Sequence, residues 1–266
     1  MAQPKYILYV LIVFLATILS TYGRDFLITD SGAIGDGTTL NTAAIQRAID
    51  AAASEPNGGC VVVPAGVFRT GSIFLRDGVE LFIEKNGVIL GSTDIADYPK
   101  RGTRIEGHTE PWRMALINAQ NMKRVRITGQ GKIDGNGAPF WAEFWRRRKE
   151  NPTITNLAVE RPRLMFIHTC ADVHISGLTV RNSGFWHIHL YRCRGVVFED
   201  LDISSREAKA RAPSTDGIDI DSSQNVTVRH CRIAVDDDCI ALKGSKGPLA
   251  DRDESSPPVE NILIEK

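Results

Sequence analysis

The sequence predicts an all-β fold, a right-handed parallel β-helix whose N-terminal end is covered by one short helix. Two observations favour this solenoid. Short β-rich runs broken by Gly, Pro and Asn follow one another beyond residue 57, and four late segments repeat one apolar pattern. The segments are CADVHISGLTV, CRGVVFEDLDI, SQNVTVRHCRI and VENILIEK. Such strands alternate inward and outward and are too short for helical repeats.

The repeat is defined by its apolar positions. Aligning Val173, Val196, Val226 and Ile262 places successive coils 23, 30 and 36 residues apart. In the first three segments apolar residues recur at offsets 0, 2, 5 and 7. The growing interval indicates loops inserted into a constant coil, and each coil is expected to stack on the preceding one at about 4.8 Å.

Two short helices interrupt the β pattern. In NTAAIQRAIDAAA, Asn41 or Thr42 is expected to cap a helix over residues 42–53, with one apolar face. This helix should cover the N-terminal end of the solenoid, whose strand edges are otherwise unpaired. The segment PFWAEFWRRRKENP predicts the second helix, with its aromatic residues on one face.

The two ends of the chain differ from its middle. Lys5 precedes an apolar run over residues 6–19, and small and polar residues follow, so residues 1–23 are interpreted as a secretory signal. The run is shorter than a membrane span requires, and an uncleaved anchor is the alternative. Residues 24–266 then form one exported domain, extracellular or periplasmic, without stable membrane association. Because PPVENILIEK begins a coil and stops, we expect an N-terminal fragment that lacks its C-terminal coils, or a truncated product.

Composition excludes some classes of function. Lys+Arg and Asp+Glu both number 32, so the chain lacks the basic excess of a nucleic-acid-binding protein. The five cysteines show no CxxC spacing, which argues against a zinc site, and their connectivity cannot be deduced. Cys170 and Cys193 share one repeat position and should be stacked neighbours, oxidised or not. A monomer is expected, since such a solenoid presents no second apolar face.

Acidic residues crowd the stretch STDGIDIDSSQNVTVRHCRIAVDDDCIALK, residues 214–243. Crowded carboxylates cost electrostatic energy unless something uses or neutralises them. Asp216 and Asp237 are 21 residues apart, about one coil, so stacking should bring them together. Alternation predicts Ile218 and Ile220 facing the core, with the two intervening aspartates outside. The outer face should then carry an acidic groove. The acidic residues of the stretch are Asp216, Asp219, Asp221, Asp236, Asp237 and Asp238.

Paired carboxylates suit glycoside hydrolysis. One carboxyl donates a proton to the leaving oxygen, and its ionised neighbours activate a water. In inverting enzymes the two groups lie about 6.5–9.5 Å apart, which leaves room for that water. Mutual repulsion raises the pKa of one carboxyl and keeps it protonated.

The same stretch resembles the polygalacturonase family of pectin-degrading hydrolases, with its N-T-D-G and D-D-C-[IL]-A signatures. The resemblance covers nearly the whole chain after residue 23, including GQGKIDGNG and RPRLMFIHTCADVHISGLTVRNSGFWHIH. It implies a right-handed parallel β-helix and inverting hydrolysis of α-1,4-linked galacturonosyl bonds, without a metal or other cofactor. By position it makes Asp237 the general acid, while Asp216 and Asp238 hold and activate the water.

The chain also departs from the family pattern. Ser214 replaces the usual Asn before Thr-Asp, and Ser222 stands where fungal endo-acting enzymes carry a substrate-facing Asn. The segments FWHIH and ALKGSKGP look closer to bacterial exo-acting members. The family's Gly-His-Gly and Arg-x-Lys motifs would lie just past Lys266, so we expect the chain as given to be inactive.

Three residues are expected to bind substrate. His187 and His189 flank Ile188 and share a strand face, which places them beside the sugar or, alternatively, in structural roles. Lys243 follows the second acidic motif and would supply the cation that an anionic sugar needs. Three further basic residues precede Asp216 and either line the groove or solvate a loop. They are Arg206, Lys209 and Arg211.

Other functions compete with a pectin or polygalacturonate hydrolase. A hydrolase of rhamnogalacturonan or xylogalacturonan would use the same carboxylates with altered pockets. A non-catalytic β-helix that binds polysaccharide would not need Asp237, so Asp237→Asn would leave its function intact. A lyase would hold calcium among the clustered aspartates and lose activity on chelation.

Overall fold

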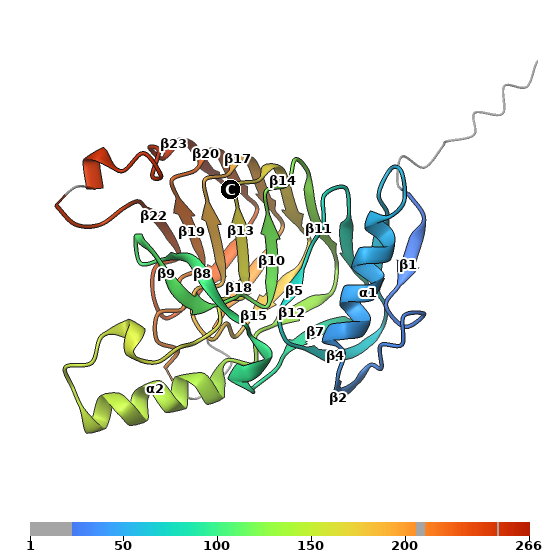
Figure 1. Ribbon diagram of the computed structural model, residues 1–266, viewed down its shortest axis with the longest axis horizontal. Helices are drawn as coiled ribbons and strands as arrows, with labels where there is room; N and C mark the ends of the chain where they lie inside the picture. The colour runs from blue at the N-terminus through green and yellow to red at the C-terminus, as the bar shows by residue number, and fades with distance from the viewer. Residues whose placement is uncertain (1–22, 206–210, 249) are drawn as a thin grey trace, which may run out of the picture.

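Three parallel sheets wind around one interior in the computed structural model, which describes residues 23–205, 211–248 and 250–266 (Figure 1). Sheet A contains β1 (Asp25–Leu27), β3 (Cys60–Val63), β6 (Glu80–Ile83), β11 (Val125–Gly129), β14 (Ala171–Ser176), β17 (Arg194–Glu199), β20 (Gln224–Arg229) and β23 (Glu260–Glu265). Sheet B contains β2 (Asp36–Leu40), β4 (Gly66–Thr70), β7 (Gly87–Gly91), β12 (Lys132–Asp134), β15 (Thr179–Arg181), β18 (Asp202–Ser204) and β21 (Arg232–Ala234). Sheet C contains β5 (Ile73–Phe74), β10 (Ile117–Gln120), β13 (Met165–His168), β16 (Ile188–Tyr191), β19 (Ile218–Asp221) and β22 (Ile240–Lys243).

Elements outside the three sheets are few in the described ranges. They are the helices α1 (Thr42–Ala53) and α2 (Ala138–Glu150), three short 3-10 helices (Ile95–Asp97, Asn156–Ala158 and Ala250–Arg252), and an antiparallel hairpin of β8 (Lys100–Ile105) and β9 (His108–Arg113). The predicted parallel β-helix is therefore confirmed. In the part of the chain that the structure describes, no helix combines the length and the apolar character needed to cross a bilayer.

The repeat alignment is confirmed by the strand register. Val173 pairs with Val196, Val196 with Val226, and Val226 with Ile262, all in parallel ladders of sheet A. The apolar offsets mark inward-facing side chains: Val173, Ile175, Leu178 and Val180 are all buried. Each coil therefore contributes one layer to a continuous apolar interior.

The first helix covers the N-terminal end of this interior, as predicted. Five apolar residues of α1 are buried, and the helix lies beside β1 and β5 (Figure 1). The capping prediction needs a correction, because Asn41 occupies the N-cap without a side-chain hydrogen bond to the helix. Its carboxamide instead accepts from the Ile34 N–H at 2.7 Å and donates to the carbonyls of Ile34 and Thr39. The first turn of α1 therefore has no side-chain cap.

The hairpin β8–β9 packs over the outer face of sheet C. Ile105 and Trp112 from the hairpin form a buried cluster with Phe185 and Trp186, which precede β16. The Trp112 indole N–H donates to the carbonyl of Arg161 at 3.1 Å. These contacts hold the hairpin against the segment that leads into β16.

At the last coil, apolar positions that are buried one coil earlier meet solvent. Ile220 is buried in β19, whereas its register partner Leu242 in β22 is 62% exposed. Ile264 of β23 is likewise 58% exposed, whereas its register partner Val228 is buried.

Two sets of predicted features remain: one falls on residues that the structure does not describe, and the other concerns the cysteines. Apart from Gly23, the expected signal at residues 1–23 is not described, and neither are Arg206 and Lys209. Cys170 and Cys193 stack as predicted, since Ala171 pairs with Arg194 in the ladder. All five cysteines, which the structure describes, are unpaired thiols.

Replacing Phe198 by alanine is expected to lower the free energy of unfolding by about 3–5 kcal/mol. Phe198 is fully buried between the register partners Ile175 and Val228. Its neighbour Val197 points outward, so Val197→Ala is the matched control and should cost about 1 kcal/mol or less. Equilibrium urea unfolding measures both. Equal losses in the two variants would contradict the assignment of Phe198 to the interior.

Candidate active site

Three carboxylates meet at the N-terminal ends of β19 and β22. Asp216 precedes β19, and Asp237 and Asp238 precede β22. The register Ile218–Ile240 stacks the two segments, and the Gly217 N–H donates to the Asp238 carbonyl at 2.8 Å. One carboxylate oxygen from each of the three aspartates lies within 4.8 Å of the other two. The structure therefore brings the three predicted catalytic residues together.

This spacing can hold a single water. Two oxygens within 4.8 Å of each other both reach one water at a hydrogen-bond distance of about 2.8 Å. The limit of 4.8 Å applies to the nearest oxygen atoms of the aspartates. The expected range of about 6.5–9.5 Å is the separation between whole carboxyl groups. Asp216 is buried, while Asp237 and Asp238 are exposed, and Asp237 Oδ1 accepts the Asp238 N–H at 3.1 Å. The cluster is thus buried on one side and open to solvent on the other.

Gly217 allows the close approach of the two coils. A Cβ at this position would lie 2.5 Å from the carbonyl oxygen of Cys239 and 2.6 Å from Ile233 Cγ2. Any larger residue would push β19 away from the segment that carries Asp237 and Asp238. Packing between the two coils therefore requires glycine at this position.

Lys243 bridges two of the acids. Its Nζ lies 3.0 Å from Asp216 Oδ2, 3.1 Å from Asp219 Oδ1 and 4.4 Å from the centroid of the Trp186 ring. Burial raises the pKa of Asp216, and Lys243 opposes this change. Burial and the neighbouring Asp216 raise the pKa of Asp219 well above its usual range. Asp219 is therefore harder to ionise than an exposed aspartate.

The two histidines lie inside the fold. His187 and His189 are fully buried, and burial lowers their pKa values to about 4 and about 3. The His187 Nδ1–H donates to the main-chain carbonyl of Asp216 at 3.0 Å. His189 Nδ1 accepts from Arg163 at 2.7 Å. Their burial favours the structural alternative for both histidines, whereas Lys243, the third residue expected to bind substrate, is partly exposed.

Asp219 and Asp221 point away from the interior, as expected, but both are buried and do not line an open groove. Arg104 of β8 covers Asp221, with its Nε 2.8 Å from Asp221 Oδ2 and its Nη2 3.3 Å from Oδ1. The Arg163 guanidinium, also buried, donates to the Arg104 carbonyl at 2.7 Å. Sequence reasoning missed both arginines, because they lie far from the acidic stretch along the chain.

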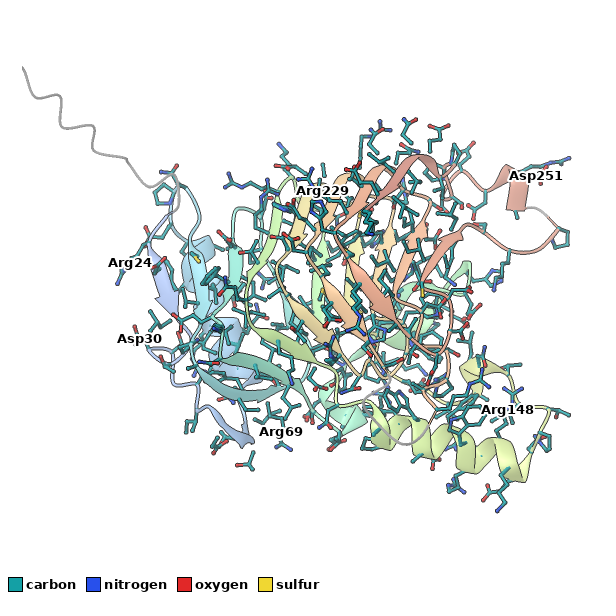
Figure 2. The ribbon with its side chains drawn as sticks, turned by 180° about the vertical axis from the view of Figure 1, so that it is seen from behind. Arg24, Asp30, Arg69, Arg148, Arg229 and Asp251 are labelled. Carbon is teal, nitrogen blue, oxygen red and sulfur yellow. The ribbon has the colours of Figure 1, made fainter. Side chains whose placement is uncertain are left out.

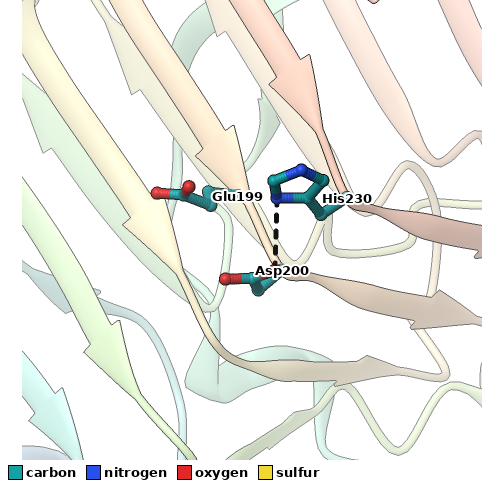
Figure 3. Close-up of side chains that lie close together, drawn as sticks. All are labelled: Glu199, Asp200 and His230. Carbon is teal, nitrogen blue, oxygen red and sulfur yellow. Dashed lines mark ion pairs between the residues drawn. The ribbon is translucent and has the colours of Figure 1, made fainter. Parts of the chain in front are cut away.

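A second cluster of carboxylate and imidazole side chains lies at the turns between sheets A and B. Figure 3 shows Glu199, Asp200 and His230 close together, with His230 Nδ1 3.6 Å from Asp200 Oδ1. Their donor atoms lie within 4.8 Å of one another. Glu199 already forms an ion pair with Arg229, whose Nε lies 2.9 Å from its Oε1.

At the cluster of Asp216, Asp237 and Asp238, the ammonium of Lys243 beside Asp216 supplies the positive charge that a metal would otherwise provide.

Replacing Lys243 by methionine is expected to raise the pKa of Asp216 further. Burial raises this pKa, and the substitution removes the cation that opposes it. Asp216 in the variant should therefore take up its proton at a higher pH than in the parent protein. Titration of the side-chain carboxyl ¹³C resonances measures the change, with the exposed Lys246→Met as control. An unchanged Asp216 titration would contradict the ion pair.

Comparison with known proteins identifies the family. Residues 61–251 match the model of glycosyl hydrolases family 28. The chain belongs to this family. It is 34% identical over 229 residues to a probable polygalacturonase of Vitis vinifera, covering 81% of this chain and 43% of the relative. It is also 30% identical over 276 residues to an exo-poly-alpha-D-galacturonosidase of Dickeya chrysanthemi, covering 86% and 43%.

A solved structure agrees with this family 28 assignment. The family 28 exopolygalacturonase of Yersinia enterocolitica superposes with a TM-score of 0.76 and 28% identity, covering 91% of this chain and 48% of that one. The predicted resemblance to polygalacturonases is thereby confirmed. The chain spans about half the length of the relatives it matches.

Proposed function

We propose that this family 28 protein forms the catalytic part of a secreted, exo-acting galacturonan hydrolase that acts on pectin. The observation that supports it best is the meeting of three carboxylates within 4.8 Å, beside Lys243, at the position where two coils stack. The names of the relatives, polygalacturonase and exo-poly-alpha-D-galacturonosidase, support the substrate class and the exo mode.

In the proposed reaction Asp237 donates its proton to the glycosidic oxygen as the bond to the anomeric carbon breaks. Asp216 and Asp238 hold a water between them, and one of them takes its proton as the water oxygen attacks that carbon. Asp237 is exposed and can reach a polymer, whereas Asp216 is buried beneath the cluster. Lys243 keeps positive charge beside Asp216 and favours its ionised form.

Hydrolysis of polygalacturonate tests the proposal, by reducing-end release and by the products formed. Since the chain spans about half the length of its relatives, the assay uses both the 266-residue protein and the product of its gene's complete reading frame. Monogalacturonate as the first product, with neutral galactan untouched, is expected. Loss of turnover on chelation, or unsaturated products, would indicate a lyase and refute the hydrolase.

A further inference from the structure

A large cavity lies far from the three aspartates. It has a volume of about 710 Å³ and opens between the start of α1, the strand β5 and the start of β8. Volumes of this order are typical of small-molecule sites. In sheet C, β5 is four strands away from β19, or about 19 Å at the usual strand spacing. The cavity is therefore separate from the catalytic cluster.

The charged groups at this cavity are cationic. Two arginines line it, and no aspartate or glutamate does among the described residues. The Arg101 guanidinium lies 4.7 Å above the centroid of the Phe74 ring, and the described residues offer it no carboxylate partner. Arg76 is paired with Asp50 at 3.0 Å, with both side chains about half exposed. Arg101 is thus held over an aromatic ring with its charge available to a ligand.

The start of α1 adds main-chain donors to the same cavity. Thr42 and Ala43 line it, and the first helical hydrogen bond inside α1 runs from the Ile45 N–H to the Asn41 carbonyl. Asn41 gives no side-chain cap, and the first turn contains no acidic residue. The N–H groups of Thr42 and Ala43 therefore keep the partial positive charge of a helix N-terminus.

An independent observation comes from Ser72. Ser72 is only 4% exposed and lines the cavity, yet its Oγ has no hydrogen-bond partner among the described residues. A buried hydroxyl without a partner costs free energy, which a ligand oxygen in the cavity would recover. Ser72 thus points to a polar ligand at a place where the chain supplies no partner of its own.

We propose that this cavity is a second binding site, for the carboxylate of a uronic acid. The carboxylate would lie between Arg101 and the uncapped start of α1, since charge-assisted hydrogen bonds to arginine and to helix N–H groups are the strong ones. A sugar hydroxyl would partner Ser72 Oγ, and Phe74 offers an apolar face to the ring. The choice of uronic acid rests on the proposed function, whose polymer and product both carry this group.

Amide chemical shifts test the site without any need for turnover. Galacturonate and trigalacturonate are titrated into the ¹⁵N-labelled protein, and the Ala43 amide is followed beside the Gly217 amide of the catalytic cluster. The Ala43 amide is expected to shift at millimolar ligand. Arg101→Gln should weaken this binding about tenfold, and Ser72→Ala should weaken it by a smaller factor. Asp237→Asn should leave the Ala43 titration unchanged.

The control is Arg148→Gln on α2, labelled in Figure 2, since Arg148 also lies over a phenylalanine ring, at 5.7 Å from the centroid of Phe144. Galactose should not shift Ala43. If trigalacturonate binds more tightly than galacturonate, the ligand is a segment of the polymer. If the two bind equally, the ligand is the free acid. An equal response to acetate, or full binding in both Arg101→Gln and Ser72→Ala, would overturn the site. A lack of hydrolysis would refute only the proposed function.

Discussion

Asp237→Asn is expected to lower kcat on polygalacturonate by about 10³-fold, within the range of about 10²–10⁴ that general acid catalysis contributes. The amide cannot donate the proton that the glycosidic oxygen needs as its bond breaks. In an aryl galacturonide with an acidic phenol, the phenolate can leave without that proton. Hydrolysis of this substrate should therefore be nearly unaffected. The comparison of the two substrates therefore measures the acid role directly.

Asp216→Asn should behave differently. Asp216 is buried and forms an ion pair with Lys243. Because Asp216 is expected to hold the attacking water, its replacement should slow the hydrolysis of both substrates equally. The exposed Asp251→Asn is the control and should leave both rates unchanged. If Asp216→Asn kept its activity on the aryl substrate, the acid would be Asp216, in keeping with the burial that raises its pKa, and the two roles would exchange.

The sequence allowed the fold to be predicted because solenoid contacts repeat. Each coil places equivalent residues in register, so the apolar offsets of one segment already predict the ladder of Val173, Val196 and Val226. The meeting of Asp216 with Asp237 follows from the same period. Local spacing, combined with a stacking rule, was enough for these features.

Burial by distant segments could not be predicted in this way. The alternating pattern correctly predicts that the side chains of Asp219 and Asp221 point away from the interior. The hairpin that covers them is not part of the repeat, so their burial is not predicted. Arg104 reaches Asp221 from 117 residues away, and Arg163 reaches His189 across 26. No periodic pattern encodes such contacts, and for this reason the histidines were expected at the substrate and Asp221 in a groove.

Arg104→Met is expected to lower the free energy of unfolding at pH 7 by about 3–5 kcal/mol, the usual cost of leaving a buried charge without its partner. Both side chains of the pair are 2% exposed, with Arg104 Nε 2.8 Å from Asp221 Oδ2. Water cannot replace the guanidinium in so closed a place. The same change should also loosen the hairpin β8–β9 from sheet C, because Arg104 ties β8 to the end of β19.

The pH dependence of this loss follows from Asp221. Burial opposes its ionisation, but hydrogen bonds from His189 and Arg104 hold its pKa below the usual value. A depressed pKa stabilises the fold above the unfolded pKa of about 3.9 and ceases to do so as the pH falls through the folded value. In Arg104→Met the unpaired Asp221 is neutralised by acid, so the difference from the parent protein should narrow below about pH 4. Urea unfolding at several pH values measures this, and Arg104→Met/Asp221→Asn should recover part of the loss at pH 7. A difference that is the same at low and neutral pH would show that lost packing of the arginine, and not its charge, accounts for the effect.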